Sequence, residues 1–255
     1  MNDGQVDKIF HVFGSKSREI LNQFTKFKKN RFYLVPKLVG DCYCEFIIID
    51  ASEIEGKNFN QWIEGIEPIP PIIFIVGDKQ FVSDDLLIDC TLKLRDEFDS
   101  HNIFSIKNHG ELVSVLEGVS ELQNRFSLME VDFADFMQFL RYGQYYWSDT
   151  IHSQSIDKLK LKIVKKIENV NARAKKGGLK VSGLFGSIKG NISSFESNIC
   201  EEYELIMNTL KELEPLFDSD SSKLIIHTNV EMYEKIDEHE DLEIGFHMLW
   251  AFSES

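Results

Sequence analysis

The sequence predicts an α/β protein whose first half holds a mostly parallel sheet and whose second half is an α+β arrangement. Two continuous apolar runs of strand length, residues 44–50 and 72–76, are typical of strands covered on both faces. Helical patterns separate the strands, and this alternation favours parallel strands joined by right-handed crossovers. Residues 241–252 alternate apolar and polar side chains with a period of two, which predicts a half-buried antiparallel strand.

In the first half, strands are apolar runs that end at glycine, proline or charged residues, and helices repeat apolar side chains every three or four positions. Ser83 is expected to cap a helix whose first turn holds Asp84 and Asp85, since carboxylates there suit the helix dipole. Residues 51–71 are irregular apart from a helical turn at 58–63. In chain order we expect strands at 9–13, 31–35, 44–50, 72–76 and 102–106, with helices after Gly14, after Ser83 and over 110–126.

The second half contains longer helical patterns and ends in strands. Residues 133–147 and 156–170 are predicted helices, and a polar turn at 171–178 follows them. The last part of the chain then reads strand, helix, strand, strand, which is an α+β order. The corresponding ranges are 179–189, 194–213, 223–228 and 241–252.

Composition limits the classes of function. The chain has 255 residues, 43% of them hydrophobic, which supports a packed core rather than disorder. It carries 28 basic and 42 acidic residues, a net charge of -14, which argues against a nucleic-acid coat and against binding to an anionic membrane surface. No apolar run approaches the roughly 20 residues of a membrane helix, and the N-terminus does not resemble a signal peptide, so the cytoplasm is the expected location.

Cysteine and histidine patterns indicate no metal site. Cys42 and Cys44 form a C-x-C pair without a second pair or a histidine nearby, as a zinc site would require. The expected state of the cysteines is a buried, reduced thiol. The 7 histidines are scattered and match no catalytic or metal-ligand motif; His247, on the polar side of the last predicted strand, is expected to be a surface or interface residue. We therefore expect no metal and no cofactor.

One acidic segment, residues 127–136, lies where a loop leads into a helix. Asp132 and Asp135 are three residues apart, and on spacing alone they are ordinary helix-capping residues. However, V-D-F-A-D preceded by L-M resembles the loop that FtsZ, the tubulin-like division protein, carries after its central helix. The family pattern is N-x-D-x-x-D, so Asp132 and Asp135 match its two acids, whereas Glu130 stands in place of the asparagine.

The resemblance extends to the order of elements and carries expectations about fold and assembly. Residues 74–81 resemble the strand and loop after the GTPase motif, and Asn108 is the surviving polar member of a turn that reads I-P-N-D in the family. The resemblance implies an FtsZ/tubulin-like fold with a truncated Rossmann-like N-terminal lobe (1–109), a connecting helix (110–127) and an α+β C-terminal domain (128–255). In that family, the two acids enter the nucleotide site of the next subunit and position the water that attacks GTP.

The glycine-rich phosphate cradle of that family is missing. Such a cradle needs backbone N–H groups that converge on the anion at a helix N-terminus without obstruction by Cβ atoms. Here the strand at 44–50 leads into Ala51-Ser52-Glu53-Ile54-Glu55, which brings two carboxylates toward the phosphate position, and the first loop, residues 13–17, keeps only Gly14. The chain also has no G-x-x-x-x-G-K-[ST] motif. We therefore expect no catalytic residues, no nucleotide and a pseudo-GTPase.

Three functions remain open. The first is a non-catalytic FtsZ/tubulin-like protein that binds, caps or co-assembles with a cell-division type of cytoskeletal filament through Glu130, Asp132 and Asp135. The second is a structural protein that assembles with itself without nucleotide, for which the clustered aromatic residues are a candidate interface, although packing between domains explains them equally well. The third is a residual GTP-binding or GTPase protein. The candidate interface consists of Tyr142, Tyr145, Tyr146 and Trp147.

Overall fold

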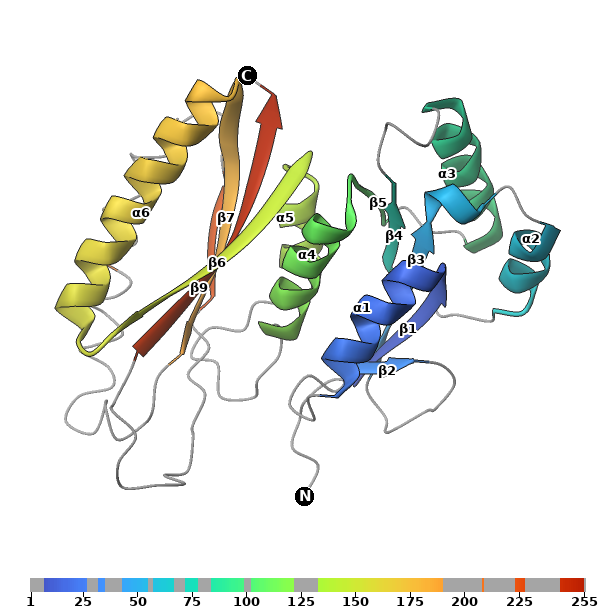
Figure 1. The fold of residues 1–255 in the computed structure, drawn as a ribbon, viewed down its shortest axis with the longest axis horizontal. Coiled ribbons are helices and arrows are strands. Elements are labelled where there is room, and N and C mark those ends of the chain that lie inside the picture. The colour runs from blue at the N-terminus through green and yellow to red at the C-terminus, as the bar shows by residue number, and fades with distance from the viewer. Residues whose placement is uncertain are drawn as a thin grey trace. The chain divides into compact units, whose positions relative to one another are not determined.

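The computed structural model divides the chain into two compact units, residues 1–113 and 114–255. Figure 1 shows the order of the elements along the chain. The boundary between the two units falls within helix α4 (His109–Glu121), so that this helix belongs to both units. The residues that the structure describes are 7–26, 32–34, 43–54, 57–66, 72–77, 84–98, 102–121, 133–189, 208, 223–227 and 244–254.

The first unit is built on a five-stranded parallel sheet with the strand order β2-β1-β3-β4-β5. Every strand predicted from the sequence in this half is present, and Ile47 and Ile73 lie opposite each other on β3 and β4. The helices are α1 (Ser15–Thr25), α2 (Lys57–Glu64) and α3 (Asp84–Phe98). The strands are β1 (Asp7–Phe13), β2 (Phe32–Leu34), β3 (Tyr43–Asp50), β4 (Ile72–Val76) and β5 (Ile103–Ile106).

The apolar runs become central strands because both faces of the sheet are covered. On one face, four phenylalanine rings form a row across the sheet, with centroid distances of 4.8 Å between Phe10 and Phe46, 6.1 Å between Phe46 and Phe74, and 6.1 Å between Phe74 and Phe104. On the other face, isoleucines of β3 and β4 pack with residues of α2 and α3. Successive side chains of β3 and β4 therefore point into cores on opposite faces of the sheet. This explains why the sequences of these strands do not alternate between apolar and polar residues.

Cys90 of α3 confirms the expectation of a buried thiol. It is free, it is only 4% exposed, and it packs in the core between α3 and the sheet. Burial raises the pKa of this thiol to about 11, although Lys93 acts in the opposite direction. Because the thiolate is the reactive form, Cys90 should be inert while the first unit is folded.

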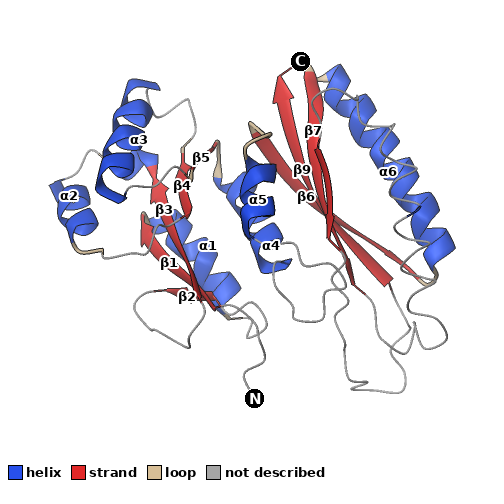
Figure 2. Ribbon diagram, turned by 180° about the vertical axis from the view of Figure 1, so that it is seen from behind, coloured by secondary structure: helices blue, strands red, loops and turns tan. Residues whose placement is uncertain are grey.

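The second unit is a four-stranded sheet with the order β6-β9-β7-β8. β9 (Ile244–Glu254) lies antiparallel to both β6 (Tyr145–Ser153) and β7 (Leu179–Lys189), whereas β7 and β8 (Lys223–His227) are parallel. Figure 2 shows α6 (Ile156–Lys176) along one face of this sheet and α5 (Phe133–Leu140) on the other.

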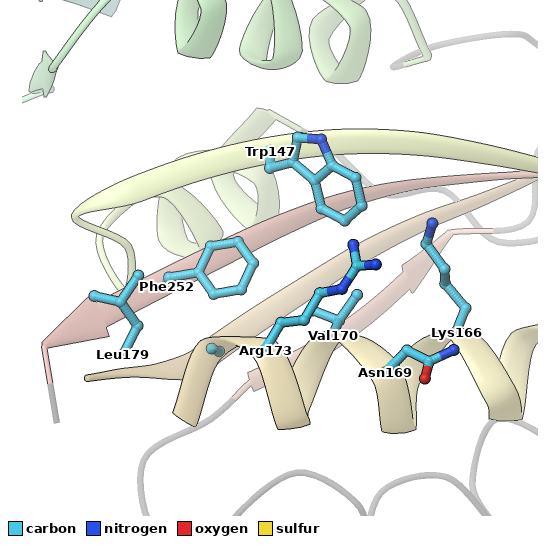
Figure 3. A pocket seen from close by; sticks show the side chains of 8 residues that line it. Trp147, Lys166, Asn169, Val170, Arg173, Leu179 and Phe252 are labelled. Atoms are coloured by element: carbon cyan, nitrogen blue, oxygen red, sulfur yellow. The ribbon is translucent and has the colours of Figure 1, made fainter. Parts of the chain in front are cut away.

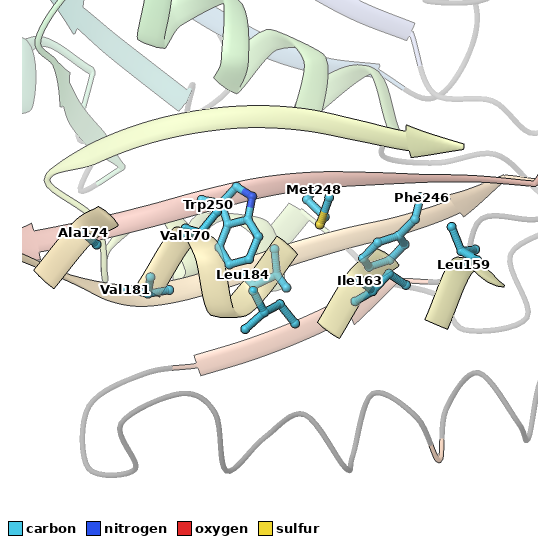
Figure 4. Close-up of a cluster of buried hydrophobic side chains, with 10 residues drawn as sticks. Leu159, Ile163, Val170, Ala174, Val181, Leu184, Phe246, Met248 and Trp250 are labelled. Carbon is cyan, nitrogen blue, oxygen red and sulfur yellow. The ribbon is translucent and has the colours of Figure 1, made fainter. Parts of the chain in front are cut away.

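Helix α6 and the sheet enclose the larger core of the second unit. Ser155 caps the helix by accepting a hydrogen bond from the Lys158 backbone N–H, and Gly177 ends it. Figure 4 shows side chains of α6 packed against those of β7 and β9, with fully buried Trp250 among them. On the opposite face, Leu249 lies against Gly118 of α4, where an added Cβ atom would be only 2.6 Å from the Leu249 side chain.

Three sequence expectations for the second half need correction. The helix predicted at 133–147 ends at Leu140, and residues 145–147 instead begin strand β6. The helix predicted at 156–170 continues to Lys176, so most of the expected turn is helical. Residues 245–251 of β9 are all buried, because helices cover both faces of the sheet, and His247, expected to be a surface or interface residue, is buried with its Nδ1 atom 3.0 Å from the Thr150 hydroxyl.

The strands predicted at 179–189 and 223–228 are confirmed as β7 and β8. The helix predicted at 194–213 lies outside the described residues, apart from Asn208, which is helical. Among the described helices, none is long and apolar enough to cross a membrane.

Candidate functional site

The topology of the first unit places a candidate site at the carboxyl ends of β1 and β3. The strand order reverses between these two strands, and parallel α/β sheets bind ligands in the crevice at such a point. β1 ends at Phe13 and leads through Gly14 into α1, while β3 ends at Asp50 and leads into a short 3-10 turn, Ala51–Glu53. The N-terminus of α1 therefore faces the end of β3.

Gly14 allows the close approach of these two segments. Its φ angle is 132°, a backbone conformation that only glycine adopts readily. A Cβ atom at this position would lie 2.1 Å from Oδ2 of Asp50. The single glycine that the loop retains is thus needed to accommodate a carboxylate of the protein itself.

The Asp50 carboxylate is bound to the first turn of α1. Asp50 is 2% exposed. Its Oδ2 atom accepts a hydrogen bond of 3.2 Å from the Ser17 backbone N–H, and its Oδ1 atom accepts a second from the Ser17 hydroxyl. Ser17 is fully buried, so this contact is shielded from water and strengthened accordingly.

Glu53 binds the same helix N-terminus from the exposed side. Its Oε1 atom accepts hydrogen bonds from the Ser15 backbone N–H at 2.9 Å and from the Ser15 hydroxyl at 2.8 Å. Asp50 and Glu53 together therefore occupy two of the backbone donors at the start of α1, and they place two carboxylates at the positive end of the helix dipole.

The turn after β5 supplies a third side chain to the site. His109 Nε2 lies 3.0 Å from Oδ1 of Asp50. His109 begins α4, where Asn108 accepts from the Glu111 backbone N–H at 3.0 Å and donates from Nδ2 to the Glu111 carboxylate at 3.2 Å. This reciprocal pair is a variant of the capping box, so Asn108 orients the turn that presents His109.

The arrangement is that of an anchored carboxylate rather than a nucleophilic triad. Asp50 stands between Ser17 and His109, whereas a catalytic triad places the histidine between the nucleophile and the acid. Among the described residues, no three His, Cys, Asp or Glu side chains are grouped so as to hold a metal ion. The chemistry that the site does show is the neutralisation of a helix N-terminus by internal carboxylates.

Replacing Gly14 with alanine should lower the free energy of unfolding of the first unit by about 2 kcal/mol, because the φ angle is strained for alanine and the methyl group collides with Asp50. The measurement is urea unfolding followed by thiol labelling of the peptide that carries Cys90. Gly178→Ala is a control for backbone strain without a collision, since that glycine has a φ of 73° but open space around it. Because Gly178 lies in the second unit, its loss is measured from the urea dependence of tryptophan fluorescence, to which the buried Trp250 of that unit contributes. Equal losses for both variants would show that the contact with Asp50 adds nothing.

The structure describes only part of the acidic loop predicted from the sequence. Glu130 and Asp132 lie outside the described residues. Asp135 lies in the first turn of α5, and its side chain is half-buried rather than enclosed in the hydrophobic core. The roles of these three residues stay predictions.

The four aromatic residues of the candidate interface have different environments. Tyr146 is a core residue, 4% exposed, whose hydroxyl proton is shared between the backbone carbonyls of Leu140 and Gly143, both within hydrogen-bond reach. Tyr142 and Tyr145 are half-buried, whereas Trp147 is 39% exposed on β6. Tyr142, Tyr145 and Trp147 thus present surface, while Tyr146 packs internally.

Sequence reasoning placed Glu53 near the helix N-terminus but overlooked Asp50, Ser17 and His109. Asp50 ends an apolar strand, and its partners are 33 and 59 residues away in the sequence. A usable signal was present: Gly14 followed by a Ser-Lys-Ser segment marks a helix N-terminus after a strand, and an acid at the end of the next parallel strand reaches that point. Glu55, also expected there, lies outside the described residues.

Comparison with known proteins identifies the fold. No protein-family model matches the chain, and no curated protein sequence does. Among solved structures, an FtsZ point mutant from M. jannaschii is 10% identical with a TM-score of 0.51, over 97% of this chain and 91% of that one. This match and the architecture described above show an FtsZ/tubulin-like α/β fold, as the sequence resemblance implied.

Two further solved structures are similar at lower scores. TubZ from Bacillus thuringiensis serovar israelensis, in GDP-form protofilaments, is 13% identical with a TM-score of 0.48, over 98% of this chain and 86% of that one. CetZ1 from Haloferax volcanii, a GDP-bound monomer, is 6% identical with a TM-score of 0.48, over 96% of this chain and 93% of that one.

Proposed function

We propose that this chain is a non-catalytic FtsZ/tubulin-like protein that binds, caps or co-assembles with a filament of related cytoskeletal subunits. The observation that carries the proposal is the occupation of the α1 N-terminus by Asp50 and Glu53. In a nucleotide-binding protein of this architecture, those backbone N–H groups and the helix dipole would face the phosphates.

The two carboxylates oppose phosphate binding in two ways. They consume the donors at Ser15 and Ser17, so a phosphate would have to displace hydrogen bonds that already exist. They also bring negative charge to the place where the phosphate charge would lie, and like charges at such short range repel, most strongly at Asp50, which is buried from water. A chain with this site is not expected to bind or hydrolyse GTP.

The sequence keeps the two acids, Asp132 and Asp135, of the loop before α5. According to the family resemblance, that loop enters the nucleotide site of a neighbouring subunit. Filaments of this type are head-to-tail, heterologous assemblies, in which each subunit uses two different faces. A subunit that keeps the loop but has no nucleotide face can join one end of a filament and then prevents further addition there. Capping therefore follows from the loss of one face only.

Self-assembly without nucleotide is the second candidate, and a specific surface favours it. Ile88 and Leu92 are 56% and 50% exposed, and they lie four residues apart on the same side of α3. Exposed apolar side chains that adjoin one another are typical of interaction surfaces. A chain that forms its own oligomer through α3 should lose it when Ile88 and Leu92 become serine, whereas a filament cap should remain active.

The direct test is a GTP titration. We expect no heat in isothermal titration with GTP and Mg²⁺ and no rise of the melting temperature, because a binder would be stabilised by mass action. Micromolar affinity for GTP would refute the proposal and support a residual GTPase instead. Glu53→Gln is the informative variant, since Glu53 is exposed and its loss leaves the core intact. Weak pyrophosphate binding gained by this variant would identify the carboxylate as the obstacle.

A further inference from the structure

A cavity of about 390 Å³ lies in the second unit, and Trp147 of the candidate interface is one of the residues that line it. It opens between α6 and the sheet, where β6 and β7 begin and β9 ends. Figure 3 shows Trp147 on β6 and Phe252 on β9 as aromatic walls, with Arg173 reaching from α6 into the space between them. The volume falls within the range of small-molecule sites in proteins, about 300–1,000 Å³.

The lining combines apolar walls with cationic side chains. Val170, Leu179 and Phe252 supply apolar surface. Lys166 lies on the same side of α6 as Arg173, two helical turns away, and its Nζ atom is 4.9 Å from the centroid of the Trp147 ring. Lys166 also forms an ion pair with Asp149 of β6, so its ammonium group is held at the edge of the cavity.

The helix that bears these cations is basic in an acidic protein. The 21 residues of α6 include eight lysines and arginines, against only Asp157 and Glu168, whereas the whole chain has a net charge of -14. A concentration of one sign of charge beside a cavity with apolar walls raises the local concentration of oppositely charged ligands. The positive charge of α6 and the lining of the cavity therefore both favour a negatively charged ligand with an apolar part.

We propose that this cavity binds a small amphipathic anion, with a flat apolar body between Trp147 and Phe252 and an acidic group between Lys166 and Arg173. The aromatic walls favour a planar body, and a guanidinium group binds a carboxylate, sulfonate or phosphate by paired hydrogen bonds. The inference does not depend on the proposed filament function, because it rests on the second unit alone.

The probe for the test is 8-anilinonaphthalene-1-sulfonate, which is aromatic, anionic and fluorescent in apolar surroundings. It should bind the full chain at one site, and Arg173→Ala should weaken binding by about tenfold. Lys175→Ala is the matched control: it removes the same charge from the same helix but does not line the cavity, so its affinity should stay within about twofold of the wild type. N-phenyl-1-naphthylamine, which lacks the sulfonate, should bind at least about tenfold more weakly.

Asn169→Trp provides an independent check, since this exposed residue lines the cavity and the larger side chain should block binding without a change of charge. Circular dichroism establishes that each variant is folded. Equal weakening by Arg173→Ala and Lys175→Ala would reduce the effect to general attraction by α6 and overturn the proposal. Equal affinity for the neutral probe, several bound molecules per chain, or undiminished binding by Asn169→Trp would overturn it as well.

Discussion

Replacing Asp50 with alanine should lower the free energy of unfolding of the first unit by about 3 kcal/mol, because it leaves the buried Ser17 N–H and hydroxyl and His109 without their acceptor. Urea dependence of thiol labelling on the peptide that contains Cys90 measures this loss, since Cys90 is buried in the same unit. The expected result is a large decrease in the urea concentration at which Cys90 becomes labelled.

Two comparisons separate this role from a general effect of the substitution. Glu53→Gln, at an exposed position, should change stability by no more than about 0.5 kcal/mol. Gly14→Ala should be less harmful in the Asp50→Ala background than in the wild type, because the collision with the carboxylate is gone and only the backbone strain remains. If Asp50→Ala is as mild as Glu53→Gln, or if the effects of Gly14→Ala and Asp50→Ala simply add, then the carboxylate does not anchor α1.

The fold was predictable where local patterns and tertiary environment agree. The stretches at 46–49 and 72–76 are apolar throughout, and the structure buries every residue in them. The prediction failed at 141–147 because Tyr145, Tyr146 and Trp147 continue the apolar spacing of α5, although aromatic residues also favour strands. Gly143 is the residue in the sequence that indicates the end of the helix, since glycine often follows a helix C-terminus. In the structure, an added Cβ atom at this position would be 2.6 Å from the Tyr146 ring.

The candidate site was less predictable than the fold because its contacts join distant segments. That the phosphate cradle is missing can be read from the composition of residues 13–17 and 51–55 alone. What replaces it cannot, since an aspartate at a strand end is equally compatible with solvent exposure. The identification of Asp50 as a ligand of α1 required the parallel register of β1 and β3, which aligns Phe13 with Ile49 and thus places Gly14 beside Asp50.

The second large effect concerns assembly. At about one-tenth molar ratio, the wild-type chain should change the light scattering of an FtsZ or tubulin-like protein from the same cell, because one molecule per filament end is sufficient. The double variant Asp132→Ala, Asp135→Ala should lose nearly all of this effect, since the proposal places both acids in the nucleotide site of the terminal subunit. Folding should be nearly unchanged, because a capping residue contributes only about 1 kcal/mol.

The control is the double variant Asp157→Ala, Glu168→Ala. It removes the same charge from the same unit, and Asp157 occupies the first turn of α6 as Asp135 occupies that of α5, so the two variants share their effect on net charge and on a helix dipole. The control should act on filaments like the wild type. If the loop variant also retains the effect, Asp132 and Asp135 are helix caps only, and the contact with the filament lies elsewhere.

An effect that appears only at equimolar ratios would indicate sequestration of free subunits or co-assembly along the filament, because capping depends on the number of ends rather than on the number of subunits. Complete absence of an effect at any ratio would remove the interaction with a filament and leave self-assembly as the leading function. In that case the exposed side chains Ile88 and Leu92 become decisive, and sedimentation of the chain alone should show an oligomer that their replacement by serine dissolves.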